Sequence, residues 1–148
     1  MVVRKLSAVV AVMIAVLGSL TLAAPAQAAN AFEFNHAVST TKDGCFIYQT
    51  PVGCGDFDSR GDYFLVKDTL PDGHSAAIYW HNYLPGSTAL YRWGSCVNSL
   101  GNGQKGQCNK NFQEGSKIEY KVCAFEGGST PSDVRSYFEC GDVWETTA

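Results

Sequence analysis

Apolar and polar residues alternate in short segments along most of this chain. The clearest segment is KIEYKVCAF at residues 117–125, in which Ile118, Tyr120 and Val122 alternate with charged residues. Further β-branched or aromatic runs occupy residues 45–49, 62–68, 75–81, 89–93, 134–140 and 142–147. Glycine or proline separates these runs, and no segment keeps a helical period. The pattern indicates one all-β domain, a sandwich or a barrel, and we expect a small antiparallel β-sandwich.

The residues before the first cysteine predict an extended N-terminal arm at 29–44. Phe32 and Phe34 alternate there with Glu33 and Asn35, as in a strand. A frayed terminus is the alternative, because chain ends are commonly disordered unless they dock. A solvated tail gains nothing from two phenylalanines, however. We therefore expect an arm at 29–44, followed by the β-sandwich domain at 45–148.

The first 28 residues have the order of a secretory signal peptide. Arg4 and Lys5 precede a continuous apolar run, which ends in Ala26-Gln27-Ala28. A retained membrane anchor is the alternative, since the run is long enough to span a bilayer. The small-residue cleavage site favours removal after Ala28. We expect a signal peptide at 1–28 and a secreted, extracellular protein that has no membrane contact after cleavage.

All six cysteines follow the predicted signal peptide. An even number of cysteines in an exported chain predicts three disulfides. Six cysteines allow many pairings, but each sequential pair brackets a turn-rich segment, as a bridge across a short loop would. The expected disulfides are Cys45–Cys54, Cys96–Cys108 and Cys123–Cys140.

The charge of the chain is mildly acidic. Eleven Lys and Arg residues face 14 Asp and Glu residues, for a formal net charge of −3 at pH 7. Loss of Arg4 and Lys5 with the signal peptide makes the remainder more acidic, and the other basic residues are scattered. Nucleic-acid binding needs clustered Lys and Arg, so we expect no nucleic-acid partner.

Residues 101–106 spell G-x-G-x-x-G, the dinucleotide-binding fingerprint. That motif works between a buried parallel strand and a helix N-terminus. Neither flank here has that pattern, because SCVNSL before the glycines and QCNKNF after them do not read as a strand followed by a helix. Cys96 and Cys108 enclose the glycines on both sides. We interpret the stretch as a disulfide-stapled turn with Lys105 at an exposed tip, a place suited to contact with a partner.

Metal and cofactor sites are not predicted. No two cysteines are spaced as zinc ligands. Asp56 and Asp58 resemble the start of a calcium loop, but Arg60 and Lys67 stand where further oxygen ligands are needed. We therefore expect no bound metal and no cofactor.

Two sets of residues contain the types needed for catalysis. Asp72, His74 and Ser75 provide the types of a hydrolytic triad, although no nucleophile elbow is present. A nuclease-like set could combine His81 with Glu119 and Arg92. Such sets arise by chance among strand residues, so the expectation is no catalytic residue and no enzyme. A secreted hydrolase or nuclease remains an alternative.

Aromatic residues gather between residues 78 and 93. Alternation places Trp80 on one face of a strand and Tyr79 and His81 on the other. Exposed aromatic residues mark surfaces that recognise sugars or proteins. The alternative is that both faces are covered and these rings belong to the core. Tyr79 and Tyr83 are the candidate binding residues of this segment.

Several segments of the chain resemble a known group of proteins. They are GDYFLVKD at 61–68, DGHSAAIYW at 72–80, residues 94–123 from GSC to KVC, and Cys140. The chain is similar over these residues to small secreted disulfide-bonded proteins of actinobacteria. Some of those proteins are similar to the adaptor subunit of umbrella toxin particles.

The resemblance implies a secreted, non-enzymatic adaptor in an antibacterial toxin complex. Such an adaptor joins a lectin-like subunit to a large repeat-containing toxin subunit. The arm with Phe32 and Phe34 would then be a docking strand for the lectin, through β-strand addition. A small secreted carbohydrate-binding or inhibitor module is the runner-up.

Overall fold

The computed structural model describes residues 31–45 and 50–148. The predicted signal peptide at 1–28 and most of the strand predicted at 45–49 therefore lie outside the described residues. In the described part, no helix is long and apolar enough to cross a membrane.

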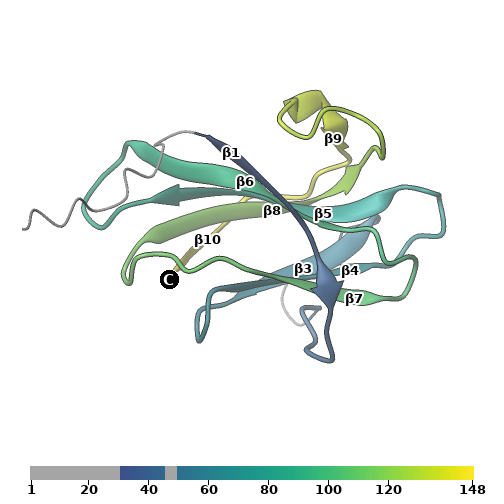
Figure 1. Cartoon of the computed structure of the whole chain (residues 1–148), viewed down its shortest axis with the longest axis horizontal. Helices are drawn as coiled ribbons and strands as arrows, with labels where there is room; N and C mark the ends of the chain where they lie inside the picture. Colours follow the sequence, from purple (N-terminus) through teal and green to yellow (C-terminus); the bar gives the residue numbers. More distant parts are fainter. Residues whose placement is uncertain (1–30, 46–49) are drawn as a thin grey trace, which may run out of the picture.

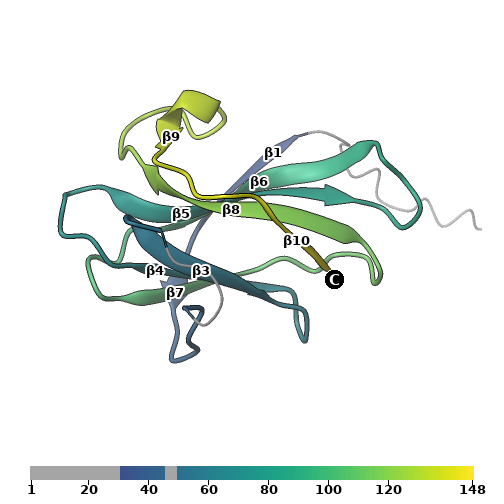
Figure 2. The ribbon, with the colours of Figure 1, turned by 180° about the vertical axis from the view of Figure 1, so that it is seen from behind.

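The described residues form two β-sheets, which Figures 1 and 2 show as two layers from opposite sides. The larger sheet has the order β1-β6-β5-β8-β10, with β9 also paired to β8. Its strands are β1 (Phe32–His36), β5 (Ser75–Tyr83), β6 (Leu90–Asn98), β8 (Lys117–Phe125), β9 (Tyr137–Phe138) and β10 (Trp144–Thr147). The smaller sheet has the order β2-β7-β4-β3. Its strands are β2 (Val38–Ser39), β3 (Gly53–Asp58), β4 (Tyr63–Asp68) and β7 (Lys105–Asn109), and a 3-10 turn, η1, spans Val134–Ser136.

The predicted all-β sandwich is confirmed. Alternate residues of β4, β5 and β8 point between the sheets, as the sequence pattern requires. At the centre, the Phe64 and Trp80 rings stack with their centroids 5.8 Å apart, and both side chains are fully buried. The strand pairings are antiparallel except for that between β1 and β6, which is parallel.

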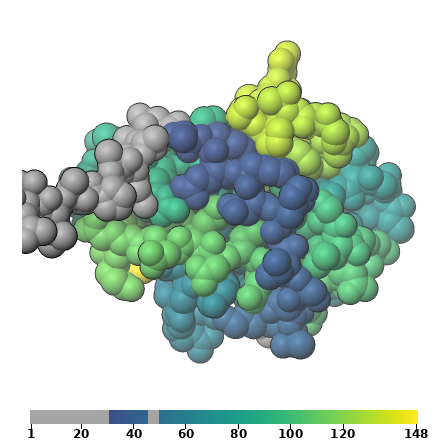
Figure 3. Space-filling model, viewed as in Figure 1, coloured from purple at the N-terminus to yellow at the C-terminus, as the bar shows by residue number. Residues whose placement is uncertain are grey.

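The N-terminal arm contributes a strand to each sheet. β1 pairs with β6 of the larger sheet, and β2 pairs with β7 of the smaller one. Between them the amide of Ala37 donates a hydrogen bond to the Val97 carbonyl, at 2.8 Å. Figure 3 shows the arm in dark blue as a band across one side of the molecule. The arm is therefore an edge strand of both layers rather than a projecting tail.

All three predicted disulfides are present: Cys45–Cys54, Cys96–Cys108 and Cys123–Cys140. Disulfides in this number are typical of extracellular proteins. The Cys96–Cys108 bridge joins β6 of the larger sheet to β7 of the smaller one. The glycine-rich turn that it encloses therefore carries the chain from one layer to the other, and the bridge fixes the two layers together.

Candidate binding surface and the cluster that anchors the arm

The outward face of the larger sheet carries a continuous group of aromatic side chains. They come from β1, β5 and β6, which are neighbours in this sheet. The odd-numbered residues of β5 and β6 point outward, because Trp80 and Cys96 on the alternate positions are in the core. We call this group the outer aromatic patch: Phe32, Tyr79, His81, Tyr83 and Trp93.

The rings of the patch meet mostly edge to face. Phe32 and Trp93 have centroids 4.8 Å apart, and Tyr79 and His81 have centroids 5.4 Å apart. His81 also lies 6.4 Å from Tyr83 and 6.5 Å from Trp93. Such tilted pairs are the favoured arrangement of aromatic rings. The patch is therefore a packed surface whose members position one another.

Tyr79 forms the floor of the patch. Its side chain is only 9% exposed, because Phe32, Trp93 and the Tyr137 ring close over it. Burial also raises the pKa of its hydroxyl. Tyr79 thus belongs to a second apolar cluster outside the main core, together with Ala77, Val97, Cys123, Phe125 and Tyr137. Tyr79 therefore supports the other rings of the patch from below and offers little surface of its own to a partner.

Tyr83 lies half-buried at the edge of the patch, beside charged residues of β8. Its hydroxyl donates a hydrogen bond to Glu119 Oε2 at 3.0 Å. The Lys117 ammonium binds the other oxygen of Glu119 at 2.7 Å and lies 4.5 Å from the centre of the Tyr83 ring. These contacts give the apolar patch a polar rim, an arrangement that is common in protein interfaces.

A hollow of about 210 Å³ lies next to Tyr79 and His81, with Glu119, Tyr120, Lys121 and Val143 as its other lining residues. No described residue forms a hydrogen bond with the His81 imidazole. Burial lowers the pKa of His81, although Glu119 opposes the shift. The imidazole is therefore mainly neutral near pH 7, with one donor and one acceptor nitrogen for a bound group.

The two phenylalanines of the arm dock on the protein's own sheet. Phe32 packs against Trp93, while Phe34 packs 5.7 Å from Phe125 and 4.9 Å from the His36 ring. Both are half-buried and cover the second apolar cluster. The strand predicted from their alternation is confirmed, and β1 itself occupies an edge of the larger sheet.

Lys105 is not at an exposed tip. It is the first residue of β7, it is half-buried, and its ammonium binds the Asp43 carboxylate at 2.9 Å. Gln104 and the glycines before it are exposed and form the tip. The prediction that Lys105 lies at the exposed tip is therefore wrong, and Lys105 begins the strand that follows the turn. The prediction failed because a lysine within G-Q-K-G shows none of the alternation that marks a strand.

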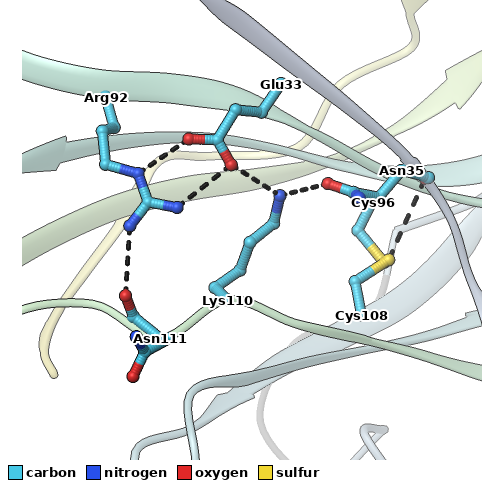
Figure 4. Close-up of polar contacts among 7 residues, drawn as sticks. All are labelled: Glu33, Asn35, Arg92, Cys96, Cys108, Lys110 and Asn111. Carbon is cyan, nitrogen blue, oxygen red and sulfur yellow. Dashed lines mark hydrogen bonds and ion pairs between the residues drawn. A yellow bond between two sulfur atoms is a disulfide. The ribbon is translucent and has the colours of Figure 1, made fainter. Parts of the chain in front are cut away.

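A cluster of charged residues lies beneath β1, where no sequence pattern predicts a site (Figure 4). The Arg92 guanidinium binds both oxygens of Glu33, at 2.7 and 3.1 Å, and the carbonyl of Asn111 at 3.2 Å. The Lys110 ammonium binds Glu33 Oε2 at 3.3 Å and contacts the side-chain oxygen of Asn35. Because β1 is an edge strand, these inward polar residues meet the cations at the rim of the sandwich.

Burial makes this cluster unusual. The Lys110 side chain is only 2% exposed, and its ammonium lies 4.5 Å from the centre of the Trp80 ring. Burial lowers the pKa of Lys110 to about 8, although Glu33 opposes the shift. Burial raises the pKa of Glu33, but Arg92 and Lys110 outweigh it and hold this pKa below its ordinary value. The carboxylate of the arm therefore compensates two cations.

The residues considered for catalysis do not form a relay. The Asp72 carboxylate accepts a hydrogen bond from the backbone amide of His74, and the His74 ring faces Glu126. The Ser75 hydroxyl donates a hydrogen bond to the Ser99 hydroxyl. His81 and Glu119 are cross-strand neighbours on the outward face. Arg92 points to the opposite face, where it binds Glu33.

Among the described residues, no group of His, Cys, Asp and Glu has the arrangement of a metal site. Asp56 and Asp58, which resemble the start of a calcium loop, both lie in β3. The Asp58 carboxylate binds Lys42 at 3.3 Å and Arg60 at 3.0 Å.

Comparison with protein-family models, with curated proteins and with solved structures finds no match for this chain.

Proposed function

We propose that the protein is a secreted, non-enzymatic adaptor that binds a protein partner through the outer aromatic patch. The observation that supports this proposal is the patch itself. It combines packed rings, a hollow beside His81 and a charged rim on one face of a disulfide-braced sheet. Aromatic residues with a polar rim are enriched at protein interfaces.

An adaptor needs a second surface, and β1 provides one. Within the described residues β1 pairs with β6 alone, so its other edge can accept a further strand. Strand addition there would use main-chain hydrogen bonds for affinity. Following the resemblance to umbrella toxin adaptors, the lectin-like subunit takes the β1 edge, and the large repeat-containing toxin subunit takes the patch.

Co-purification tests the adaptor role. The tagged mature chain is recovered from the culture supernatant of its source, and its partners are identified by mass spectrometry. Partners that disappear with His81→Ala plus Tyr83→Ala support binding through the patch. Tyr63→Ala is the matched control, because Tyr63 is also half-buried but lies in the smaller sheet. Recovery of the wild-type chain only as a lone monomer would count against an adaptor.

A carbohydrate-binding module is the second candidate, supported by the hollow beside Tyr79 and His81 with Glu119 and Lys121 on its walls. Glycan-array binding that is lost with Trp93→Ala would favour it. Trp80 is no target for this test, because it is fully buried between the sheets. An array with no bound glycan would remove this candidate.

Export after removal of residues 1–28 is part of the proposal, and the disulfides support it. N-terminal sequencing of the secreted protein tests it directly. The expected first residue is Ala29, and a chain retained in the membrane fraction with Met1 would contradict it.

A further inference from the structure

Lys110, Asn35 and Glu33 bring together an amine, a carboxamide and a carboxylate under β1 (Figure 4). Lys110 follows the end of β7, and the other two are inward residues of β1. The Lys110 nitrogen contacts the side-chain oxygen of Asn35 and lies 3.3 Å from Glu33 Oε2. These are the groups that an amide exchange requires: a nucleophile, an electrophile and a proton acceptor.

The amine is prepared for nucleophilic attack. Lysine attacks carbonyl carbons only in its neutral form, and burial favours that form. The Lys110 side chain is 2% exposed and lies against the Trp80 ring. Its pKa of about 8 gives a neutral fraction at neutral pH far larger than that of an exposed lysine.

The carboxamide of Asn35 is placed for that attack. The carboxamide oxygen that the Lys110 nitrogen contacts is one bond from the carbon under attack. Pairing of β1 with β6 fixes the Asn35 backbone opposite Cys96, and Cys96 is joined to Cys108 near Lys110. Proximity of this kind turns a slow reaction into an intramolecular one. Asn35 is also exposed at the sheet edge, so a small leaving group can escape to solvent.

Glu33 is placed to move the protons. Its Oε2 atom accepts a hydrogen bond from the Lys110 ammonium, and Arg92 holds the carboxylate in a two-point contact. The lowered pKa of Glu33 keeps the carboxylate ionised at neutral pH, as a proton acceptor must be. Arg92 does not contact the reacting atoms and acts as a positioning residue.

We propose that the Lys110 side chain forms an isopeptide bond with the Asn35 side chain, assisted by Glu33. The bond from Lys110 Nζ to Asn35 Cγ forms, and the bond from Asn35 Cγ to Nδ2 breaks. The two protons that the ammonium loses pass through Glu33 to the departing nitrogen, which leaves as ammonium. Charge and atoms balance, and the step needs no oxidant, metal or further reactant. The product joins β1 covalently to the end of β7.

Peptide mapping of the wild-type mature protein tests the bond. After reduction and alkylation, trypsin should release a branched peptide that joins the peptide ending at Lys42 to residues 106–117, uncut at Lys110. Its mass should equal that of the two peptides less one ammonia. Cleavage at Lys110, with the two halves 106–110 and 111–117 recovered separately, would overturn the proposal.

Matched variants separate this bond from other losses of ammonia. Asn102 precedes Gly103 in an exposed turn and can lose ammonia by cyclising, so intact mass alone does not decide. Asn35→Ala should abolish the branched peptide, while Lys105→Arg, a change to the other lysine of this region, should keep it. Glu33→Gln should greatly reduce the branched peptide in protein that circular dichroism shows to be folded. An undiminished branch in folded Glu33→Gln would remove Glu33 from the reaction.

Discussion

The backbone carbonyl of Glu33 lies directly over Gly94, so closely that a methyl group on Gly94 would come within 2.1 Å of that oxygen. Gly94 is the residue of β6 opposite Glu33 in the parallel β1–β6 pair. The contact joins backbone to backbone, so no side-chain rotation can relieve an added atom. The pairing of β1 with β6 therefore requires a residue without a side chain at position 94.

Gly94→Ala should loosen β1 while the rest of the sandwich stays folded. We expect faster hydrogen exchange of the amides from Phe32 to His36, because the added methyl pushes β1 away from β6. Gly127→Ala is the matched control, since a methyl group there meets nothing within 4 Å. Unchanged protection of β1 in Gly94→Ala would show that the arm does not rest on this contact.

In an Asn35→Ala background, where no bond between Lys110 and Asn35 can form, Glu33→Gln should destabilise the protein by about 3 kcal/mol, because removal of the carboxylate leaves buried cations without compensation. Urea titration of the disulfide-intact protein measures the change. Asp133→Asn is the control: it removes another two-point contact with an arginine, but Arg135 there is 86% exposed. We expect that control to change stability little. A similar effect of both variants would argue against a special role of the arm cluster.

Stability should fall in acid partly through Glu33. The folded-state pKa of this carboxyl is below its ordinary value of 4.5. Its contribution is therefore complete above pH 4.5 and is lost as the pH falls through the folded-state pKa, where the unfolded chain binds the proton more tightly. In the Asn35→Ala background, the loss of unfolding free energy caused by Glu33→Gln should shrink over that range. A difference that is constant down to acid pH would contradict this account.

Substitutions of Tyr79 and His81 should have different effects on the stability of the protein. Tyr79→Ala should destabilise the protein by about 3 kcal/mol, because it opens a cavity beneath the patch. His81→Ala should change the melting temperature little, since the imidazole is half-buried and has no hydrogen bond to a described residue. Thermal unfolding followed by circular dichroism measures both. A large loss with His81→Ala would show that His81 serves the fold rather than a partner.

The alternation of apolar residues was sufficient to predict the longer strands. The run at 117–125 coincides with β8, and the run at 62–68 with β4, which begins at Tyr63. β3 and β7 were missed, because their sequences GCGDFD and KGQCN show glycine and charge instead of alternation. Gly106 of β7 has no side chain because the link between β1 and β2 passes over it. A methyl group there would come within 2.6 Å of the Ala37 side chain.

The cluster under the arm could not be predicted from local pattern. In the sequence, Glu33 and Lys110 look like solvated charges, and 77 positions separate them. Their burial follows from the edge position of β1, which places its polar side inward at the rim. The aromatic patch was foreseen in part: Trp80 is in the core and His81 is on the opposite face, as alternation required. The covering of Tyr79 by Phe32 and Tyr137 required knowledge of the tertiary structure.

The crossing of the arm between the sheets also determines the order in which the chain can fold. Glu33 meets Arg92 across 59 positions, and β2 pairs with β7. Contacts that close such long loops form late, since their entropy cost precedes any gain. The first described residues to leave the ribosome are thus among the last to be seated. Until β6 and β7 exist, Phe32 and Phe34 stay uncovered, and a neighbouring chain that already has those strands can capture them.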